Sequence, residues 1–189
     1  MTDDTSRSML AAHQCVSVGA RTLHTLRASL ERDLGGNAAT YLQEAGFSGG
    51  GELYGAFTAW LAGSTGVSEP GALDRAHLPG ILTAFFTTMG WGSLDVTQLG
   101  DALLSIESVD WAEAEPTAGA MYPTCHVTSG LLSSFMGHLG GGMTAVLEVE
   151  CRSRGDARCR FLAGAPETMH AMYERLAAGL GVEQAIGQG

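Results

Sequence analysis

The chain has 189 residues, of which 45% are hydrophobic, and its ten arginines, with no lysine, leave a formal charge of −10 at pH 7. This size and composition suit a single domain with a substantial core. The acidic balance argues against a nucleic-acid-binding surface, and no apolar run approaches the ~18 residues of a membrane span. The opening residues, MTDDTSRSMLAAHQ, lack the basic and apolar regions of a signal peptide, so we expect a cytoplasmic protein.

Helices dominate the expected structure of the first half. Apolar residues near helical spacing predict one amphipathic helix from Ser8 to Leu34, which ends at Gly35 and Gly36. Shorter helices are expected at about 37–45, 50–61 and 79–88. The segment 63–74 carries the Gly, Ser and Pro residues of a loop.

Strands enter in the second half. The pattern predicts strands at 92–98 and 102–112, a loop at 114–123, a helix at 127–139, strands at 143–151 and 158–162, and a closing helix at 166–179. This order predicts an α+β fold of two layers, with a mainly antiparallel sheet packed against helices. We expect one domain over residues 8–180, preceded by a flexible segment (1–7) and followed by a tail (181–189).

Three cysteines and a carboxylate suggest a metal site. Cys125 precedes an expected helix, Glu148 and Cys151 lie at the end of an expected strand, and Cys159 follows across the turn SRGDAR. This turn favours a hairpin that places Cys151 and Cys159 on neighbouring strands. Three thiols and one carboxyl are the right number of ligands for a closed tetrahedral zinc site.

Other interpretations of these cysteines stay open. Each one alone could be a small buried hydrophobic residue, and Cys151 and Cys159 could form a disulfide in an oxidising compartment. Strict strand alternation also puts Glu148 with Glu150, and Cys151 on the opposite face. A bulge or twist near the strand end is therefore needed for Glu148 and Cys151 to converge.

Four arginines crowd the expected hairpin: Arg152, Arg154, Arg158 and Arg160. They either offset the net charge of a zinc ion bound by three thiolates and a carboxylate or form a solvated face. Several histidines lie on expected helices without a metal-like companion, and we interpret them as surface or capping residues: His13, His24, His138 and His170. Cys15 is assigned no role.

The run CHVTSGLLSSFMGHLGGGMTAVLEVECRSRGDARCRF resembles the 4-vinyl reductase domain family. Through SSFMG and EVEC it is similar to the sensor domains of phenol- and xylene-responsive bacterial activators. YLQEAGFSGGGE and MGWG resemble upstream parts of the family, so the resemblance covers roughly residues 8–180. It implies the ligand-binding fold shared with NO-signalling and Golgi-transport proteins. It also implies that four residues bind zinc, namely Cys125, Glu148, Cys151 and Cys159.

The aromatic residues in the middle of the chain predict an apolar pocket between helices and sheet. The segment SVDWAEAE resembles a strand that contacts the ligand in the phenol sensors, which makes Trp111 the first candidate for ligand binding. His77 is the candidate for the upstream histidine of those sensors. Further candidates come from the aromatic supply, namely Phe85, Trp91 and Phe135. The ligand is expected to be a small aromatic or tetrapyrrole-like molecule.

Function remains open between binding and catalysis. No nicotinamide or flavin fingerprint is present, although a vinyl reduction needs a hydride source. We therefore expect a zinc-containing sensor or carrier domain rather than an enzyme, acting as a homodimer or through a signalling or biosynthetic partner. The alternatives are a tetrapyrrole 4-vinyl reductase or its accessory protein, and an adaptor related to vesicle-tethering subunits.

Overall fold

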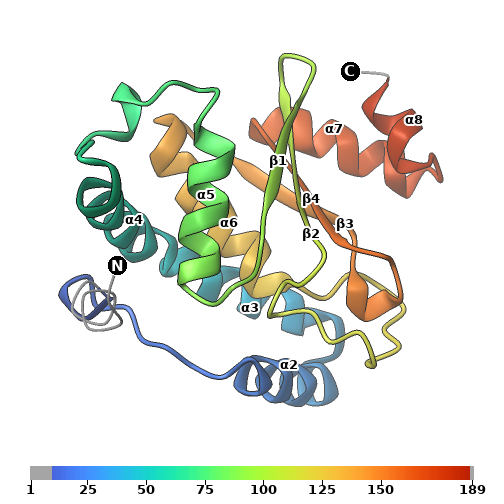
Figure 1. The fold of residues 1–189 in the computed structure, drawn as a ribbon. Coiled ribbons are helices and arrows are strands. Elements are labelled where there is room, and N and C mark those ends of the chain that lie inside the picture. Colours follow the sequence, from blue (N-terminus) through green and yellow to red (C-terminus); the bar gives the residue numbers. More distant parts are fainter. Residues whose placement is uncertain (1–9, 188–189) are drawn as a thin grey trace.

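A four-stranded antiparallel sheet in the order β1-β2-β4-β3 forms the centre of the computed structural model, which describes residues 10–187 (Figure 1). The strands are β1 (Asp95–Leu99), β2 (Leu103–Ser108), β3 (Ala145–Glu150) and β4 (Cys159–Gly164). All three pairings are antiparallel. The predicted α+β class with a mainly antiparallel sheet is confirmed.

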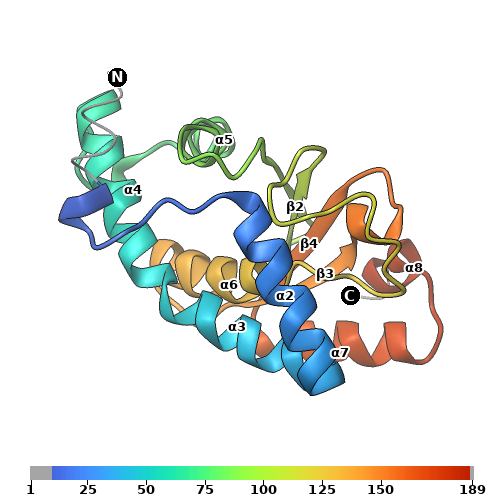
Figure 2. The ribbon, with the colours of Figure 1, turned by 90° about the horizontal axis from the view of Figure 1, so that it is seen from below.

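Helices come before, between and after the strands. They are α2 (Ala20–Leu34), α3 (Ala38–Ser48), α4 (Gly50–Thr65), α5 (Leu78–Thr88), α6 (His126–Gly140), α7 (Pro166–Ala177) and α8 (Val182–Ile186), with short 3-10 turns η1 (Gly35–Asn37), η2 (Pro70–Ala72) and η3 (Arg152–Arg154). Helix α6 packs against the sheet, and α3 and α4 pack against α6 (Figures 1 and 2). Within residues 10–187, no helix combines the length and apolar composition of a membrane span.

Alternation along β4 divides the core between the two faces of the sheet. Phe161 and Ala163 face the main cluster with α4, α5 and α6, whereas Leu162 faces a smaller cluster with Met169 and Met172 of α7. Helices therefore cover part of the second face as well. Residues 182–186, which the sequence pattern placed in a tail, form α8 and pack into this smaller cluster with a fully buried Ala185.

The predicted helix from Ser8 to Leu34 is wrong in its first half. Residues 10–12 are helical, Gln14 takes a left-handed conformation with φ of 57°, and residues 15–19 have no regular structure before α2 begins at Ala20. The segment VSVG at 16–19 consists of poor helix formers, which explains the break. This segment runs from beside α4 to the start of α2 (Figures 1 and 2). The expected flexible segment, 1–7, lies outside the described residues.

Candidate functional site

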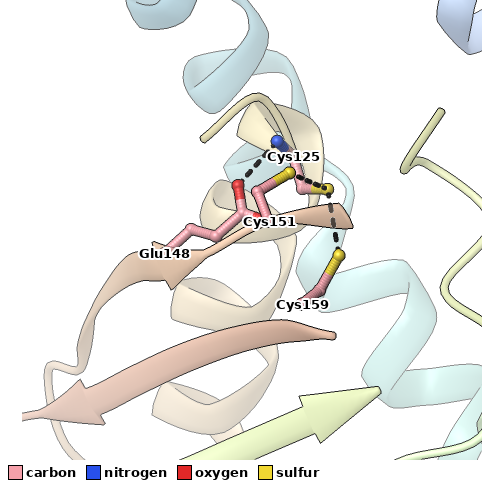
Figure 3. A group of neighbouring side chains, drawn as sticks. All are labelled: Cys125, Glu148, Cys151 and Cys159. Carbon is pink, nitrogen blue, oxygen red and sulfur yellow. Dashed lines mark hydrogen bonds between the residues drawn. The ribbon is translucent and has the colours of Figure 1, made fainter. Parts of the chain in front are cut away.

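The four predicted metal ligands meet at one end of the sheet (Figure 3). Cys125 precedes α6, Glu148 lies in β3, Cys151 follows β3, and Cys159 begins β4. One ligand atom from each residue lies within 4.8 Å of the others. The Cys125 sulfur is 3.8 Å from that of Cys151 and 3.9 Å from that of Cys159. The three cysteines are completely buried, so the cluster is closed to solvent.

A β-bulge brings Glu148 and Cys151 to the same side of the sheet. Glu148 pairs with Phe161 and Glu150 with Arg160, so Val149 is the extra residue in β3. The bulge turns Glu150 away with the Arg160 face and returns Cys151 to the side of Glu148. The irregularity that the sequence pattern required is therefore present.

The donor set fits a zinc ion. Glu148 accepts a hydrogen bond from the Cys125 backbone N–H through Oε2, at 2.8 Å, whereas its buried Oε1 has no hydrogen-bond partner among the described residues. An orphaned buried carboxylate oxygen is costly unless a cation compensates it. Three sulfurs and one carboxylate oxygen match the ligand types and number of a structural zinc site. All four described cysteines are free, so the disulfide alternative is not formed.

Crowding shifts the protonation of these groups. Burial, followed by the charge of Cys151, raises the pKa of the Glu148 carboxyl to about 9. Hydrogen bonds from the Cys125 and Cys159 thiols lower the pKa of Cys151, so the cluster already favours one thiolate. A divalent cation would favour the ionised form of all four groups, because it offsets their mutual repulsion.

A buried arginine from α2 reaches the cluster indirectly. Arg27 donates to the Thr124 hydroxyl at 2.9 Å and to Glu115 at 3.1 Å. The Thr124 hydroxyl lies 3.8 Å from the Cys151 sulfur. The loop before Cys125 is therefore fixed by a charged contact with the first described long helix, which the sequence pattern did not indicate.

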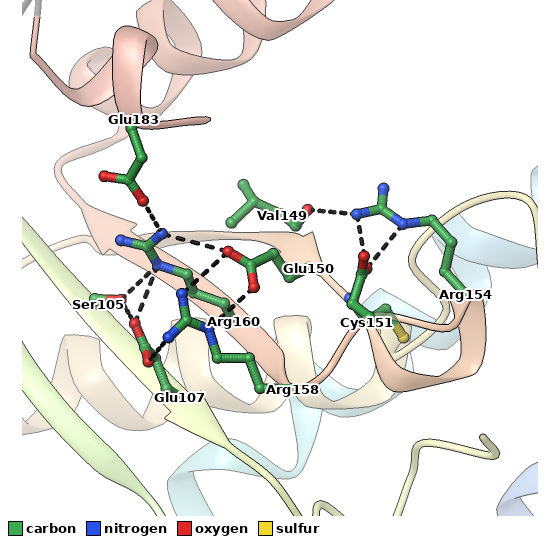
Figure 4. Close-up of polar contacts among 10 residues, drawn as sticks. Ser105, Glu107, Val149, Glu150, Cys151, Arg154, Arg158, Arg160 and Glu183 are labelled. Carbon is green, nitrogen blue, oxygen red and sulfur yellow. Dashed lines mark hydrogen bonds and ion pairs between the residues drawn. The ribbon is translucent and has the colours of Figure 1, made fainter. Parts of the chain in front are cut away.

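The hairpin arginines Arg158 and Arg160 lie on the opposite face of the sheet from the cysteines (Figure 4). Arg160 is only 4% exposed and pairs with Glu107, Glu150 and Glu183, while Arg158 pairs with Glu107 and Glu150. A solvated face is therefore wrong for Arg160. The pairs join β2, β3, β4 and α8, and they balance carboxylates rather than the metal cluster.

Glu113 is a buried residue of the site that the sequence pattern missed. Its carboxylate accepts hydrogen bonds from the Val127 and Thr128 backbone N–H groups, at 3.0 and 2.7 Å, and from the Thr128 hydroxyl. It therefore caps the first turn of α6, directly after Cys125. Burial raises its pKa to about 7. Glu113 stands too far from α6 in the sequence for a capping motif to reveal it.

Trp111 and Trp91 stack on each other, with ring centroids 5.5 Å apart. Trp111 is 1% exposed, and its indole N–H donates to the Thr128 hydroxyl at 2.6 Å. Its one donor is thus already used within the protein. Phe85 and Phe135 are completely buried and pack around Phe57 in the core.

His77 stands apart from these rings. It is exposed, directly precedes α5 and lies 4.0 Å from the Asp74 carboxylate. The described contacts do not bring it to Trp111.

A cavity of about 450 Å³ lies beneath the segment that precedes α2. Residues 10–23, the α3–α4 junction, the 89–91 turn, Ala112 and Leu131 line it. Of the five expected ligand-binding residues, Trp91 lines this cavity. A second cavity, of about 780 Å³, lies between η2, α5, the β1–β2 hairpin and the end of α6, and none of the five lines it.

Comparisons with known proteins agree with this geometry. Residues 107–165 match the family model of the 4-vinyl reductase domain, a span that contains all four residues of the metal cluster. No curated protein matches the sequence.

Three solved structures share the fold. The phenol-responsive sensory domain of the transcription activator PoxR, solved with phenol, has a TM-score of 0.62 at 18% identity over 88% of this chain and 84% of that one. A vinyl-4-reductase family protein from Methanocaldococcus jannaschii has a TM-score of 0.53 at 16% identity, over 85% and 89%. Subunit 3 of the trafficking protein particle complex from Naegleria fowleri, covalently bound to palmitic acid, has a TM-score of 0.58 at 18% identity, over 77% and 91%. Residues 107–165 thus carry a 4-vinyl reductase domain match within a fold shared with these structures, which confirms the family resemblance seen in the sequence.

Proposed function

We propose that this chain is a zinc-containing binding domain for a small, largely apolar aromatic molecule, and that it passes ligand occupancy to a partner protein or to a second copy of itself. Zinc would be held by Cys125, Glu148, Cys151 and Cys159. The ion would supply structural cross-linking between the start of α6 and the β3–β4 hairpin. The ligand would occupy the 450 Å³ cavity beside Trp91.

One observation carries the proposal: the cavity and the metal cluster are joined by a continuous set of contacts. Trp91 lines the cavity and stacks on Trp111, which donates to Thr128. Thr128 in turn donates to Glu113, which caps the helix that begins after Cys125. A molecule that shifts Trp91 would therefore act on the helix end beside the metal ligand.

The cavity size bears on the ligand class. A volume of about 450 Å³ lies in the usual range of small-molecule sites. It favours a molecule of one to a few rings over a substituted tetrapyrrole. The phenol bound by the PoxR domain, which shares the fold, is consistent with this class.

The metal half of the proposal is tested by elemental analysis and native mass spectrometry of freshly purified protein. We expect one zinc per chain, and we expect Cys151→Ser to lose it. Cys15→Ser is the matched control, because Cys15 lies outside the cluster. Protein that folds without metal and presents four freely titratable thiols would contradict the assignment.

The ligand half is tested by calorimetric titration of the full chain with simple phenols and naphthols. Trp91→Ala should weaken binding at least about tenfold, because it removes a cavity wall. Tyr41→Ala, which removes an exposed aromatic ring of α3 outside this cavity, should bind normally. Sedimentation velocity with and without ligand tests the expected homodimer. Absence of any binding would favour the adaptor alternative, and turnover of a vinyl tetrapyrrole with NADPH would favour the reductase.

A further inference from the structure

The proposed ligand cavity opens into a second, more polar space. This outer space, of about 520 Å³, lies between residues 12–14, the start of α4 and one side of α6. Three residues line both spaces: Gln14, Ser48 and Glu52. A molecule in the inner cavity could therefore extend a polar group past Glu52 into the outer space.

Glu52 is the single aspartate, glutamate or arginine that lines either space among the described residues. It sits on the first turn of α4 and is exposed, and it forms no ion pair within the described part of the chain. Its negative charge reaches the inner cavity: burial and then the charge of Glu52 raise the pKa of the Cys15 thiol, and Cys15 lines that cavity. The wall between the two spaces is thus electronegative.

The outer space adds further hydrogen-bond acceptors. A Cβ atom placed on Gly55 would lie 2.8 Å from the His13 Nδ1 atom, and one on Gly51 would lie 3.3 Å from the His138 Nε2 atom. The two imidazole rings therefore lie against one face of α4, on the turn that carries Glu52. The His138 ring also stacks on Tyr54, with centroids 5.5 Å apart. A neutral imidazole offers one acceptor nitrogen, and Gln14 offers a carbonyl oxygen.

We propose that the natural ligand carries a basic amine next to its apolar ring system, with the ring against Trp91 and the ammonium group at Glu52 between His13 and His138. This inference rests on the proposed ligand-binding function and names the ligand class. Carboxylic acids are disfavoured, because no arginine among the described residues lines either space and the chain has no lysine. An ammonium group offers donors to the carboxylate and to the acceptor atoms around it.

The test uses three probes that share one ring system: naphthylmethylamine, naphthylmethanol and naphthylacetate. Their affinities for the full chain are measured by calorimetry. We expect the amine to bind about tenfold more tightly than the alcohol, and the acid to bind most weakly, which is the scale of one partly exposed charge pair. Glu52→Gln should abolish the advantage of the amine and leave the affinity of the alcohol within about twofold.

Two controls separate a local contact from the general attraction of an acidic protein. Glu44→Gln removes the same charge from α3, and Glu44 lines neither space, so the preference for the amine should persist. High salt screens long-range attraction, so a contact at Glu52 should keep most of the preference at about 0.5 M NaCl.

The outcomes distinguish this inference from the proposed function. If the alcohol does not bind the wild-type chain, the ligand-binding function itself fails. If the alcohol binds but the amine shows no advantage, or if Glu52→Gln and Glu44→Gln reduce that advantage equally, the assignment of the amine to Glu52 is overturned while the binding function stands.

Discussion

Replacing Gly130 by alanine should separate the two helices that hold the metal site in place. Gly130 lies in α6 and faces α3. A Cβ atom there would lie 2.8 Å from both the Gln43 carbonyl carbon and the Phe47 backbone nitrogen, and closer still to the Gln43 carbonyl oxygen. Gly46 of α3 makes the reciprocal approach to the Val127 backbone. Because every obstacle is backbone, no side-chain rotation can relieve the clash.

The size of the effect follows from the missing space. Carbon atoms pack best at about 3.5–4.0 Å, so α3 and α6 would have to move apart by roughly 1 Å. Overpacking of this kind costs about 1–3 kcal/mol, and a backbone obstacle places Gly130→Ala at the upper end. The better helix propensity of alanine offsets about 1 kcal/mol. We therefore expect a net loss of about 2 kcal/mol, which corresponds to a fall in melting temperature of roughly 4–8 °C for a chain of this size.

Gly63→Ala is the matched control, because Gly63 lies in α4 and nothing stands within 4 Å of its Cβ position. This variant should be neutral or stabilised by up to about 1 kcal/mol, since only helix propensity changes. Thermal unfolding of both variants, followed by circular dichroism, gives the comparison. Equal melting temperatures for Gly130→Ala and Gly63→Ala would refute the close approach of α3 and α6. Zinc retention in Gly130→Ala should also fall, because α6 positions Cys125.

Two further predictions concern the contacts between the cavity and α6. Trp111→Phe keeps an aromatic ring but removes the hydrogen bond to Thr128 and leaves a small void, so we expect a loss of about 2 kcal/mol in chemical denaturation; an unchanged midpoint would contradict the buried hydrogen bond. For Glu113, burial places the folded-state pKa at about 7, above the ordinary value of 4.5, so the folded state holds a proton that the unfolded state releases. Stability should therefore fall as pH rises from about 4.5 to 7, by on the order of 3 kcal/mol, and Glu113→Gln should remove this component of the pH profile.

Local patterns predicted the helices, the β3–β4 hairpin and the metal cluster. The helix after Cys125 and the strands around the SRGDAR turn each carry their signal within one short stretch, so three of the four ligands were positioned by neighbouring residues. The bulge at Val149 was required by the alternation of Glu148 and Cys151 and is present. Short-range chemistry was therefore sufficient for this part of the fold.

The remaining contacts depend on the distance between residues far apart in the sequence. Periodicity joined residues 8–34 into one helix, although the left-handed Gln14 and the VSVG segment break it. No local pattern indicates that Arg27 contacts Thr124 or that Glu113 caps α6. The charges of the hairpin arginines were visible in the sequence, but their carboxylate partners on β2 and α8 were not.

Glu148 has two tasks, and two substitutions should separate them. One oxygen accepts the Cys125 backbone N–H at the start of α6, and the other is the orphaned atom available to a cation. Glu148→Gln keeps an amide oxygen that can accept from Cys125 but lacks the negative charge, so it should lose zinc affinity and retain the start of α6. Glu148→Ala should lose both. Zinc stoichiometry, together with hydrogen exchange at the first turn of α6, measures the two tasks separately. If Gln and Ala variants lose protection of that turn equally, the backbone contact contributes nothing beyond metal binding.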